Sequence, residues 1–381
     1  MDAKAVPHRQ VALEFASSTA PEKKKARKFR DSLSAVELAD DGQTLFVGVD
    51  ETVNSTPSIE RLSRTGDRYA EHEPLPVAEL LTLPNATPQK GRVGEIDIEG
   101  LAVCGSFLWV VGSHSSARKK PNGRSVEEDL KRLARVELGD NRLLLGRIPL
   151  ASSPRGATLV EHDGRNRSAR LADDLRDLLR EDPLLGPFVG SYETASGHRV
   201  TIPGKDNGFD IEGLIVTPGA ADTNRVFLGL RGPVLRGWAT IVEIALAPAD
   251  RPSQLVLGRL ERGKARYRKH LLRLDGLGIR DLRADGNDVL ILAGPTMTLD
   301  GEVAIYRWVG GLDVAKEDTL TDLEPGRLER VLTLPHGRGE DHPEGFTRLP
   351  SGEILVVYDA PADARRVGEH GVLADVFAWR G

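Results

Sequence analysis

The chain has a single cysteine, Cys104, among its 381 residues. One cysteine excludes an intramolecular disulfide and any metal site built from several thiolates. Aromatic residues make up only 5% of the sequence and form no array on which bases could stack, which argues against single-stranded nucleic-acid binding. The formal net charge of −5 supplies no general attraction for nucleic acid either. Nucleic acid is therefore not an expected partner.

Long hydrophobic runs are also lacking, since no window approaches the roughly 18 apolar residues of a membrane span. Residues 1–10 are polar and contain no apolar core of a signal peptide. The sequence has no Gly-x-x-x-x-Gly-Lys-Ser/Thr phosphate loop, no Gly-x-Ser-x-Gly elbow and no His-Glu-x-x-His zinc motif. These absences favour a cytoplasmic protein with no membrane partner, and they leave the reaction, if there is one, undefined.

A short sequence motif recurs along the chain. Residues 97–100 and 210–213 both read Asp-Ile-Glu-Gly, and residues 342–345 read His-Pro-Glu-Gly. Looser copies occupy 279–284 and 31–36, without the glutamate. Each copy leads into an apolar stretch, a turn and a second apolar stretch. This repetition predicts a series of similar antiparallel strand pairs.

The spacing of the copies predicts a ring of sheets. Aligned on the glutamate position, the copies fall at positions 32, 99, 212, 280 and 344. The distances between successive copies are therefore 67, 113, 68 and 64 residues. A step of about 65 residues accommodates the four strands of a propeller blade. Residues 10–15 and 373–379 are expected to pair and close the ring, leaving no open sheet edge. We predict an all-β fold, a single β-propeller domain over residues 1–381, with five blades.

The long step carries an insertion at residues 151–200, in the second blade. Apolar residues at helical spacing over 169–179, followed by Pro183, predict a helix there. The alternative is a degenerate extra blade within residues 150–205, which would make six.

Three segments carry a resemblance to a known family. The run 206–214, with 112–115 and 230–233, resembles a bacterial family catalogued as domain of unknown function 3616, over most of the chain. This resemblance implies a propeller-like β fold and no established activity. The Asp-x-Glu-Gly step is also similar to one in phytase-like esterases and other bacterial propellers, some of them metal-dependent hydrolases. The sequence departs from that step at residues 342–343 and at Arg280.

In a propeller, the start of each first strand and the end of each second strand lie on one face. Side chains at these places are predicted to converge on one polar pocket, the kind of concave site that binds ligands. The starts carry Ser32, Glu99, Glu212, Arg280 and Glu344. The ends carry Asp50, Glu51, Ser113, His114, Arg231, Thr296, Tyr358 and Asp359.

Converging carboxylates raise one another's pKa, and a cation relieves the repulsion. Oxygen ligands from Glu99, Glu212 and Glu344 would suit Ca²⁺ or Mg²⁺. Arg280 offers the other solution, an ion pair within the ring. A metal-bound water could then hydrolyse an anionic or phosphorylated small molecule.

Other polar residues of the predicted pocket complete this hypothesis. The predicted catalytic residues are His114, Arg231 and Arg280. His114 would act as general acid or base, and Arg231 would hold a phosphate or carboxylate. Asp50, Glu51, Ser113, Tyr358 and Asp359 would bind the ligand. A basic run at residues 117–124 would attract an anionic substrate to the opening of the predicted pocket.

Two other interpretations remain open. In the first interpretation, the glutamates only accept structural hydrogen bonds between neighbouring strands. In the second interpretation the protein is a non-catalytic module that binds a protein or peptide, or a sensor that binds a small ligand, at the face where the central channel opens. A propeller fold by itself fixes no function.

Overall fold

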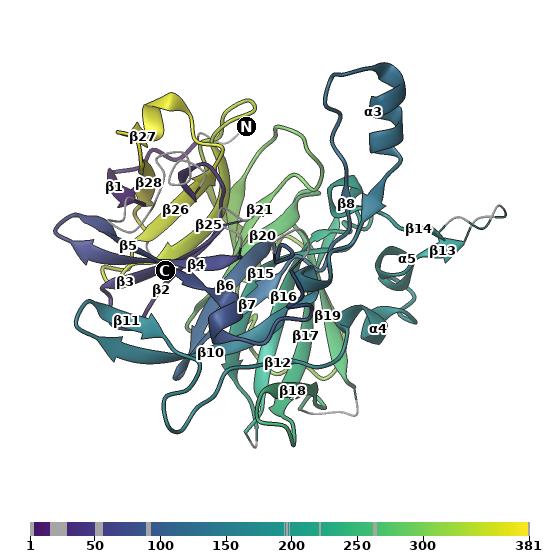
Figure 1. The fold of residues 1–381 in the computed structure, drawn as a ribbon, viewed down its shortest axis with the longest axis horizontal. Helices are drawn as coiled ribbons and strands as arrows, with labels where there is room; N and C mark the ends of the chain where they lie inside the picture. The colour runs from purple at the N-terminus through teal and green to yellow at the C-terminus, as the bar shows by residue number, and fades with distance from the viewer. Residues whose placement is uncertain are drawn as a thin grey trace.

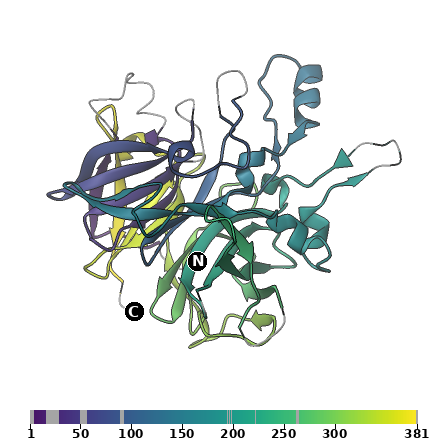
Figure 2. The ribbon, with the colours of Figure 1, turned by 60° about the horizontal axis from the view of Figure 1, so that its bottom comes forward.

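The computed structural model describes residues 4–15, 29–49, 56–88, 93–193, 195, 197, 199–220, 222–261 and 265–379. Strands dominate and helices are few and short, so the all-β prediction is confirmed. Figures 1 and 2 show antiparallel sheets arranged around a common centre. None of the helices in the described ranges is long and apolar enough to cross a membrane.

Each copy of the repeat forms the first two strands of a four-stranded antiparallel group. The first group contains β2 (Leu33–Leu38), β3 (Thr44–Val49), β4 (Ser58–Thr65) and β5 (Arg68–Pro76). The second contains β6 (Ile98–Cys104), β7 (Phe107–Gly112), β10 (Leu145–Ser153) and β12 (Ala169–Leu171). The third contains β15 (Asp210–Pro218), β16 (Asn224–Gly232), β17 (Trp238–Pro248) and β19 (Tyr267–Arg273).

The remaining groups follow the same pattern. The fourth contains β20 (Gly278–Asp285), β21 (Asp288–Gly294), β22 (Ala304–Trp308) and β24 (Leu328–Thr333). The fifth contains β25 (His342–Arg348), β26 (Ile354–Asp359), β28 (Gly371–Phe377) and β1 (Arg9–Glu14). Shorter strands attach to these sheets or form small hairpins: β8 (Ala117–Arg118), β9 (Val136–Glu137), β11 (Gly156–Leu159), β13 (Tyr192–Glu193), β14 (Arg199–Val200), β18 (Gln254–Leu257), β23 (Thr319–Thr321) and β27 (Arg366–Val367).

The first strands of the groups contact one another in a closed circle, in the order β2, β6, β15, β20, β25 and back to β2. The predicted closure is confirmed, because β1 pairs with β28 through Leu13 and Val372 and meets β5 at Tyr69. In Figure 1 this pairing places the purple N-terminal strand beside the yellow C-terminal one. The propeller-type arrangement is therefore confirmed. Hydrogen bonds also join neighbouring groups into sheets of 9 and 11 strands, so the number of blades stays a prediction.

The predicted helix over 169–179 is wrong in its first half. Residues 169–171 form β12, the outer strand of the second group, because Ala169 and Leu171 are buried at the period of two that a strand requires. The helical part of the insertion is limited to α4 (Leu175–Leu179) and α5 (Gly186–Val189). Among the residues of 150–205 that the structure describes, β11 extends a hairpin from β10, and no further four-stranded group forms.

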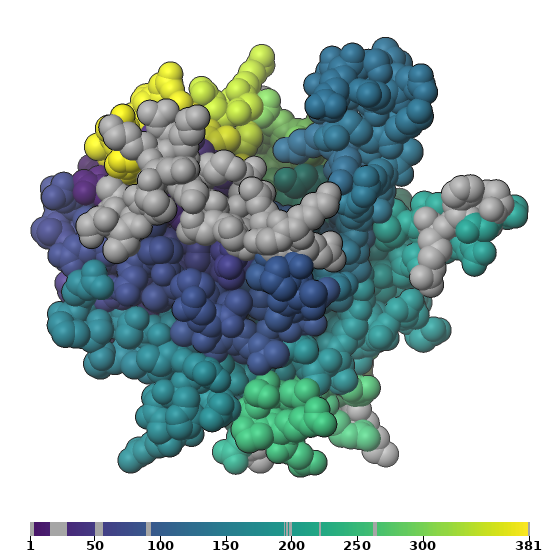
Figure 3. All heavy atoms as spheres, viewed as in Figure 1, coloured from purple at the N-terminus to yellow at the C-terminus, as the bar shows by residue number. Residues whose placement is uncertain are grey.

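Two other α-helices lie on connections. These are α2 (Val77–Leu80) and α3 (Val126–Leu133), and single 3₁₀ turns occur at Asp140–Leu143, Gly204–Asp206 and Asp363–Arg365. The Ser125 side chain caps α3 by accepting a hydrogen bond from the N–H of Glu128 at 3.1 Å. Helix α3 lies at the tip of the β8–β9 hairpin, which stands clear of the body in the space-filling view (Figure 3).

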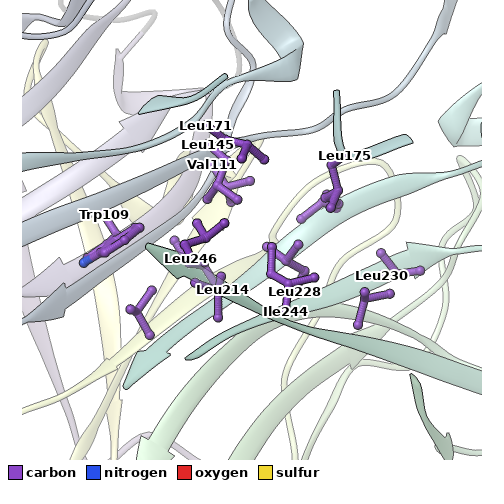
Figure 4. Close-up of a cluster of buried hydrophobic side chains, with 14 of the residues drawn as sticks. Trp109, Val111, Leu145, Leu171, Leu175, Leu214, Leu228, Leu230, Ile244 and Leu246 are labelled. Carbon is purple, nitrogen blue, oxygen red and sulfur yellow. The ribbon is translucent and has the colours of Figure 1, made fainter. Parts of the chain in front are cut away.

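The second strand of each group is mostly apolar because both of its faces are buried. In β7, Leu108 and Val110 pack in the layer toward the first group, whereas Trp109 and Val111 pack in the layer toward the third. Figure 4 shows the latter layer, where Trp109 and Val111 lie near Leu214 and other aliphatic side chains. Similar hydrophobic layers separate the other neighbouring groups. These layers hold the first strands at fixed positions around the axis.

Glycine after the repeated glutamate permits this close approach. A Cβ on Gly100 would lie 2.7 Å from Val111 Cγ1 and 2.8 Å from the Cβ of Leu214 in the next group. In the fourth group Asp281 takes the glycine's place, and its carboxylate accepts the Phe346 N–H of the fifth group at 3.0 Å. Burial raises the pKa of Asp281 to about 7, while Arg283 opposes the rise. Both solutions fasten one group to the next.

Gly100→Ala is expected to destabilise the protein by about 1–3 kcal/mol, because the added methyl group overpacks the contact between two groups. Chemical denaturation measures the difference. The matched control is Gly139→Ala, where the backbone φ is −83° and the nearest atoms lie 3.8 Å from the added Cβ. The control should stay within about 0.5 kcal/mol of the wild type. Equal effects at the two sites would contradict this account of the ring.

Candidate functional site

A β-bulge lies at the same place in each of the first strands. The register of pairing with the second strand shifts between Ile98 and Gly100, so that Glu99 is left without a partner in the ladder. Equivalent shifts leave out Ser34, Glu212, Arg280 and Glu344. A bulge re-aims the side chain of its extra residue. In the first copy the residue equivalent to Glu99 is therefore Ser34 and not the predicted Ser32, because the bulge falls two residues later.

The bulged residues meet around one small cavity of about 30 Å³. Its lining consists of Leu33, Ser34, Glu99, Lys205, Glu212, Arg231, Arg280, Glu344 and Asp359. The structure thus brings together residues that are more than 300 positions apart in the chain, including all three predicted metal ligands and both predicted catalytic arginines. We call this cavity and the two larger ones beside it the mouth.

Two arginines neutralise most of the carboxylates in the ring. Arg231 pairs with Asp210 and lies 2.6 Å from Glu212 Oε1. Arg280 pairs with Glu344 and lies 3.4 Å from Glu212 Oε2. Burial raises the pKa of Glu212, while Arg231 and Arg280 oppose the rise. The ring carboxylates Glu212 and Glu344 are therefore held by cations of the protein itself.

Glu99 differs from the other two glutamates. No described residue donates a hydrogen bond to its carboxyl group or forms an ion pair with it. Burial raises its pKa well above the usual range, and repulsion from Asp97, Glu212 and Asp210 adds to the rise. Two carboxyl groups at close range cannot both ionise without a cost in free energy, so this environment favours the protonated form of Glu99.

Asp359 lies in the same cavity and has a smaller shift. Burial and repulsion from Glu344 raise its pKa to about 6, while a hydrogen bond from the Ala360 N–H opposes the rise. Ala360 adopts φ +48°, and Asp97 at another edge of the mouth adopts φ +59°. Left-handed backbone at residues other than glycine is strained and is often found at functional sites.

Two larger cavities flank the small one. The first, of about 410 Å³, extends over residues 295–303 and includes Asp359. The second, of about 370 Å³, includes Glu99 and the start of the β8–β9 hairpin. Lys120, Lys205, Arg231 and Thr298 line both. Lys120 and Lys205 are exposed and form no ion pair with a described residue, so their charges are available to a ligand.

Five of the side chains predicted to converge on the pocket line none of these cavities: Ser32, Ser113, His114, Thr296 and Tyr358. His114 is buried; its Nδ1 donates to the Gly112 carbonyl oxygen at 2.9 Å, and burial lowers its pKa to about 4. Ser113 is fully buried, and its backbone links the second group to Ile211 of the third. Tyr358 donates to Asp375 at 2.7 Å inside the fifth group. The predicted Asp50 and Glu51 lie outside the described residues.

Sequence reasoning missed Lys205 and Arg142. Lys205 lies on a 3₁₀ turn anchored by the hydrogen bond from Gly204 N–H to the Ser116 carbonyl oxygen, 2.9 Å long. Its place just before the second copy of the repeat was the available signal. Arg142 forms an ion pair with Asp97 at 2.7 Å and occupies no position of the repeat, so no sequence pattern selects it.

The described residues contain no cluster of three histidine, cysteine or carboxylate side chains that could hold a metal ion. This agrees with the ring, in which Arg231 and Arg280 already bond to the oxygens of Glu212 and Glu344. Roles for the individual site residues stay hypotheses.

Together, the strand circle and the ion-paired mouth define a propeller-type β protein with a polar central site. The family described as "Protein of unknown function (DUF3616)" matches residues 32–375, and the chain belongs to this family. The predicted family membership is thereby confirmed, whereas the resemblance to phytase-like esterases is not. No curated protein matches the sequence.

Several solved structures are similar to this chain over most of its length. One is a streptogramin B lyase, at 10% identity with 97% of each chain covered and a TM-score of 0.35. Another is the catalytic domain of the Coprinopsis cinerea GH62 α-L-arabinofuranosidase, at 10% identity over 97% of this chain and 96% of that chain, with a TM-score of 0.42. A third is the WD40 domain of Neurospora crassa Pan2, at 9% identity over 96% and 94%, with a TM-score of 0.33. Likeness at this level carries no argument about activity.

Arg280→Met is expected to destabilise the protein by about 3–5 kcal/mol, because it leaves buried carboxylates without their cation. Thermal and chemical denaturation measure the loss. The control is Lys131→Met, which removes an exposed pair with Glu127 and should cost less than about 1 kcal/mol. If Arg280→Met were as stable as this control, the ring would not depend on its ion pairs.

Proposed function

We propose that the mouth binds a small anionic molecule and hydrolyses an ester, lactone or phosphoester bond in it, without a metal ion. The observation that carries the proposal is the pairing of Glu99 and Asp359 in one cavity. Their environments set the two carboxyl groups to different protonation states near neutral pH. Such a difference is what acid–base catalysis by two carboxyl groups requires.

The chemistry follows from these states. The small cavity, of about 30 Å³, has room for a water molecule, and both Glu99 and Asp359 line it. The ionised Asp359 takes a proton from this water while the water oxygen bonds to the carbonyl carbon or phosphorus of the substrate. Glu99, protonated, gives its proton to the leaving oxygen as the ester bond breaks. Lys205 and Arg231 border the same cavity and would stabilise the negative charge that develops on the substrate.

The earlier hypothesis of Ca²⁺ or Mg²⁺ at Glu99, Glu212 and Glu344 is not retained in this proposal. A cation bound there would face the guanidinium groups of Arg231 and Arg280, which already satisfy two of the three carboxylates. Repulsion between these positive charges disfavours the metal.

Glu99→Gln and Asp359→Asn are each expected to lower kcat/KM by about 100-fold or more, because each removes a proton-transfer group. A panel of anionic esters, lactones and phosphoesters supplies the substrate. Glu353→Gln is the control, since Glu353 pairs with Arg9 away from the mouth, and it should retain full activity. Turnover that survives both substitutions at the mouth would sink the assignment.

The pH profile of kcat/KM should be bell-shaped. Activity rises as Asp359 loses its proton, with a midpoint near pH 6, and falls at higher pH as Glu99 ionises. Steady-state rates between about pH 4 and 10 measure both limbs. The acid limb should disappear from the residual activity of Asp359→Asn, and its persistence would assign that limb to another group.

Addition of Ca²⁺, Mg²⁺ or EDTA is expected to leave the melting temperature and activity unchanged. Thermal-shift assays with each agent test this, because a ligand that binds only the native state raises its stability. A rise with either cation that is abolished in Glu212→Gln would restore the metal hypothesis.

One observation favours a second function, a sensor or binding module without chemistry. Glu212 and Glu344 are held in ion pairs, so the ring could present fixed charges to a small anion, a protein or a peptide and transfer no proton. This alternative predicts that Glu99→Gln leaves ligand affinity unchanged and that no substrate in the panel is turned over.

A further inference from the structure

The wall of the larger flanking cavity contains exposed apolar side chains. Met297 is 45% exposed and Leu299 is 62% exposed, and both line the cavity of about 410 Å³. Pro295 and Val303 line the same cavity. Exposed apolar side chains on a concave surface are a sign of a ligand groove, since a ligand would remove them from water. The second cavity lacks this group of residues; its lining is dominated by charged and small polar side chains.

Positive charge lies directly beside this apolar wall. Lys120 and Lys205 line both flanking cavities, so they lie where the two meet. The backbone of Lys120 is fixed, because its carbonyl oxygen accepts from Arg132 Nε at 2.7 Å. Neither lysine forms an ion pair with a described residue. A cationic boundary and an apolar wall therefore face the same space.

We infer that the ligand of the mouth is an amphipathic anion, with a negative group at Lys120 and Lys205 and an aliphatic or aromatic group against Met297 and Leu299. The inference rests on the anion binding in the proposed function and names its substrate class: an ester or lactone that carries an apolar acyl or aryl group and, apart from the bond that is hydrolysed, a negatively charged group. A volume of about 410 Å³ is in the range of small-molecule sites and favours such a molecule over a folded protein segment.

Calorimetric titration of the full chain with octanoate, acetate and 1-hexanol tests this. Octanoate carries both groups, acetate carries only the charge, and hexanol carries no charge. Octanoate should bind at least about tenfold more tightly than acetate, and hexanol should show no saturable binding. Met297→Ser with Leu299→Ser should bring octanoate to within about twofold of acetate and leave acetate binding unchanged. Lys205→Met should weaken both anions.

Leu320→Ser is the matched control, because Leu320 is 61% exposed on β23 and lines none of the three cavities. It should retain the preference for octanoate. Equal affinity for octanoate and acetate, or a preference that survives the double substitution, would overturn the inference.

The same titration with Glu99→Gln separates this inference from the hydrolase proposal. If the preference for octanoate persists while no ester is hydrolysed by the wild type, the ligand class holds and the proposed reaction fails. If the wild type hydrolyses acetate and octanoate esters of one alcohol with equal kcat/KM, the reaction holds and the ligand class fails.

Discussion

The extra residue in each first strand is the constraint on which the site depends. Each bulge removes one side chain from the strand ladder, and the ring turns it toward a shared space. Gly100 and its equivalents let the first strands approach closely enough for these side chains to meet. Without the bulges, the period of two along a strand would direct the same residues into the hydrophobic layers between sheets, where a charge is costly.

Charge compensation within the ring explains why so many carboxyl groups can gather there. Arg231 and Arg280 each bond to more than one acid, so Glu212 is buried beside two cations. Glu99 lies outside these pairs, and burial raises the pKa of its carboxyl group, which favours the protonated acid. One architecture thus produces two kinds of carboxyl group, one that is ion-paired with arginine and one that forms no ion pair with a described residue. The repeat places them at equivalent positions, and only the neighbouring groups make them different.

Much of the fold could be predicted because hydrophobic periodicity and turn residues are local signals. The strand pairs at Glu99, Glu212 and Glu344 and the closing pair at Leu13 were readable in this way. Residues 169–171 were not, because Leu171 fits both the helical spacing to Leu175 and the strand period of two to Ala169, and pairing with a distant strand decides between them. In the site, the convergence of the glutamates followed from the repeat. The direction of His114 did not, since its left-handed backbone turns the side chain into the core.

The sequence by itself determined the all-β architecture, the equivalence of the repeated positions and the gathering of acidic residues at one axis, because each depends on periodic patterns that a single chain displays. Only the tertiary structure decided which carboxyl groups are ion-paired, how far burial raises each pKa and which lysines line the cavities. Protonation and pairing depend on distances of a few ångströms between groups such as Glu99 and Arg231. Those distances arise when separate sheets pack together, and no local pattern encodes them.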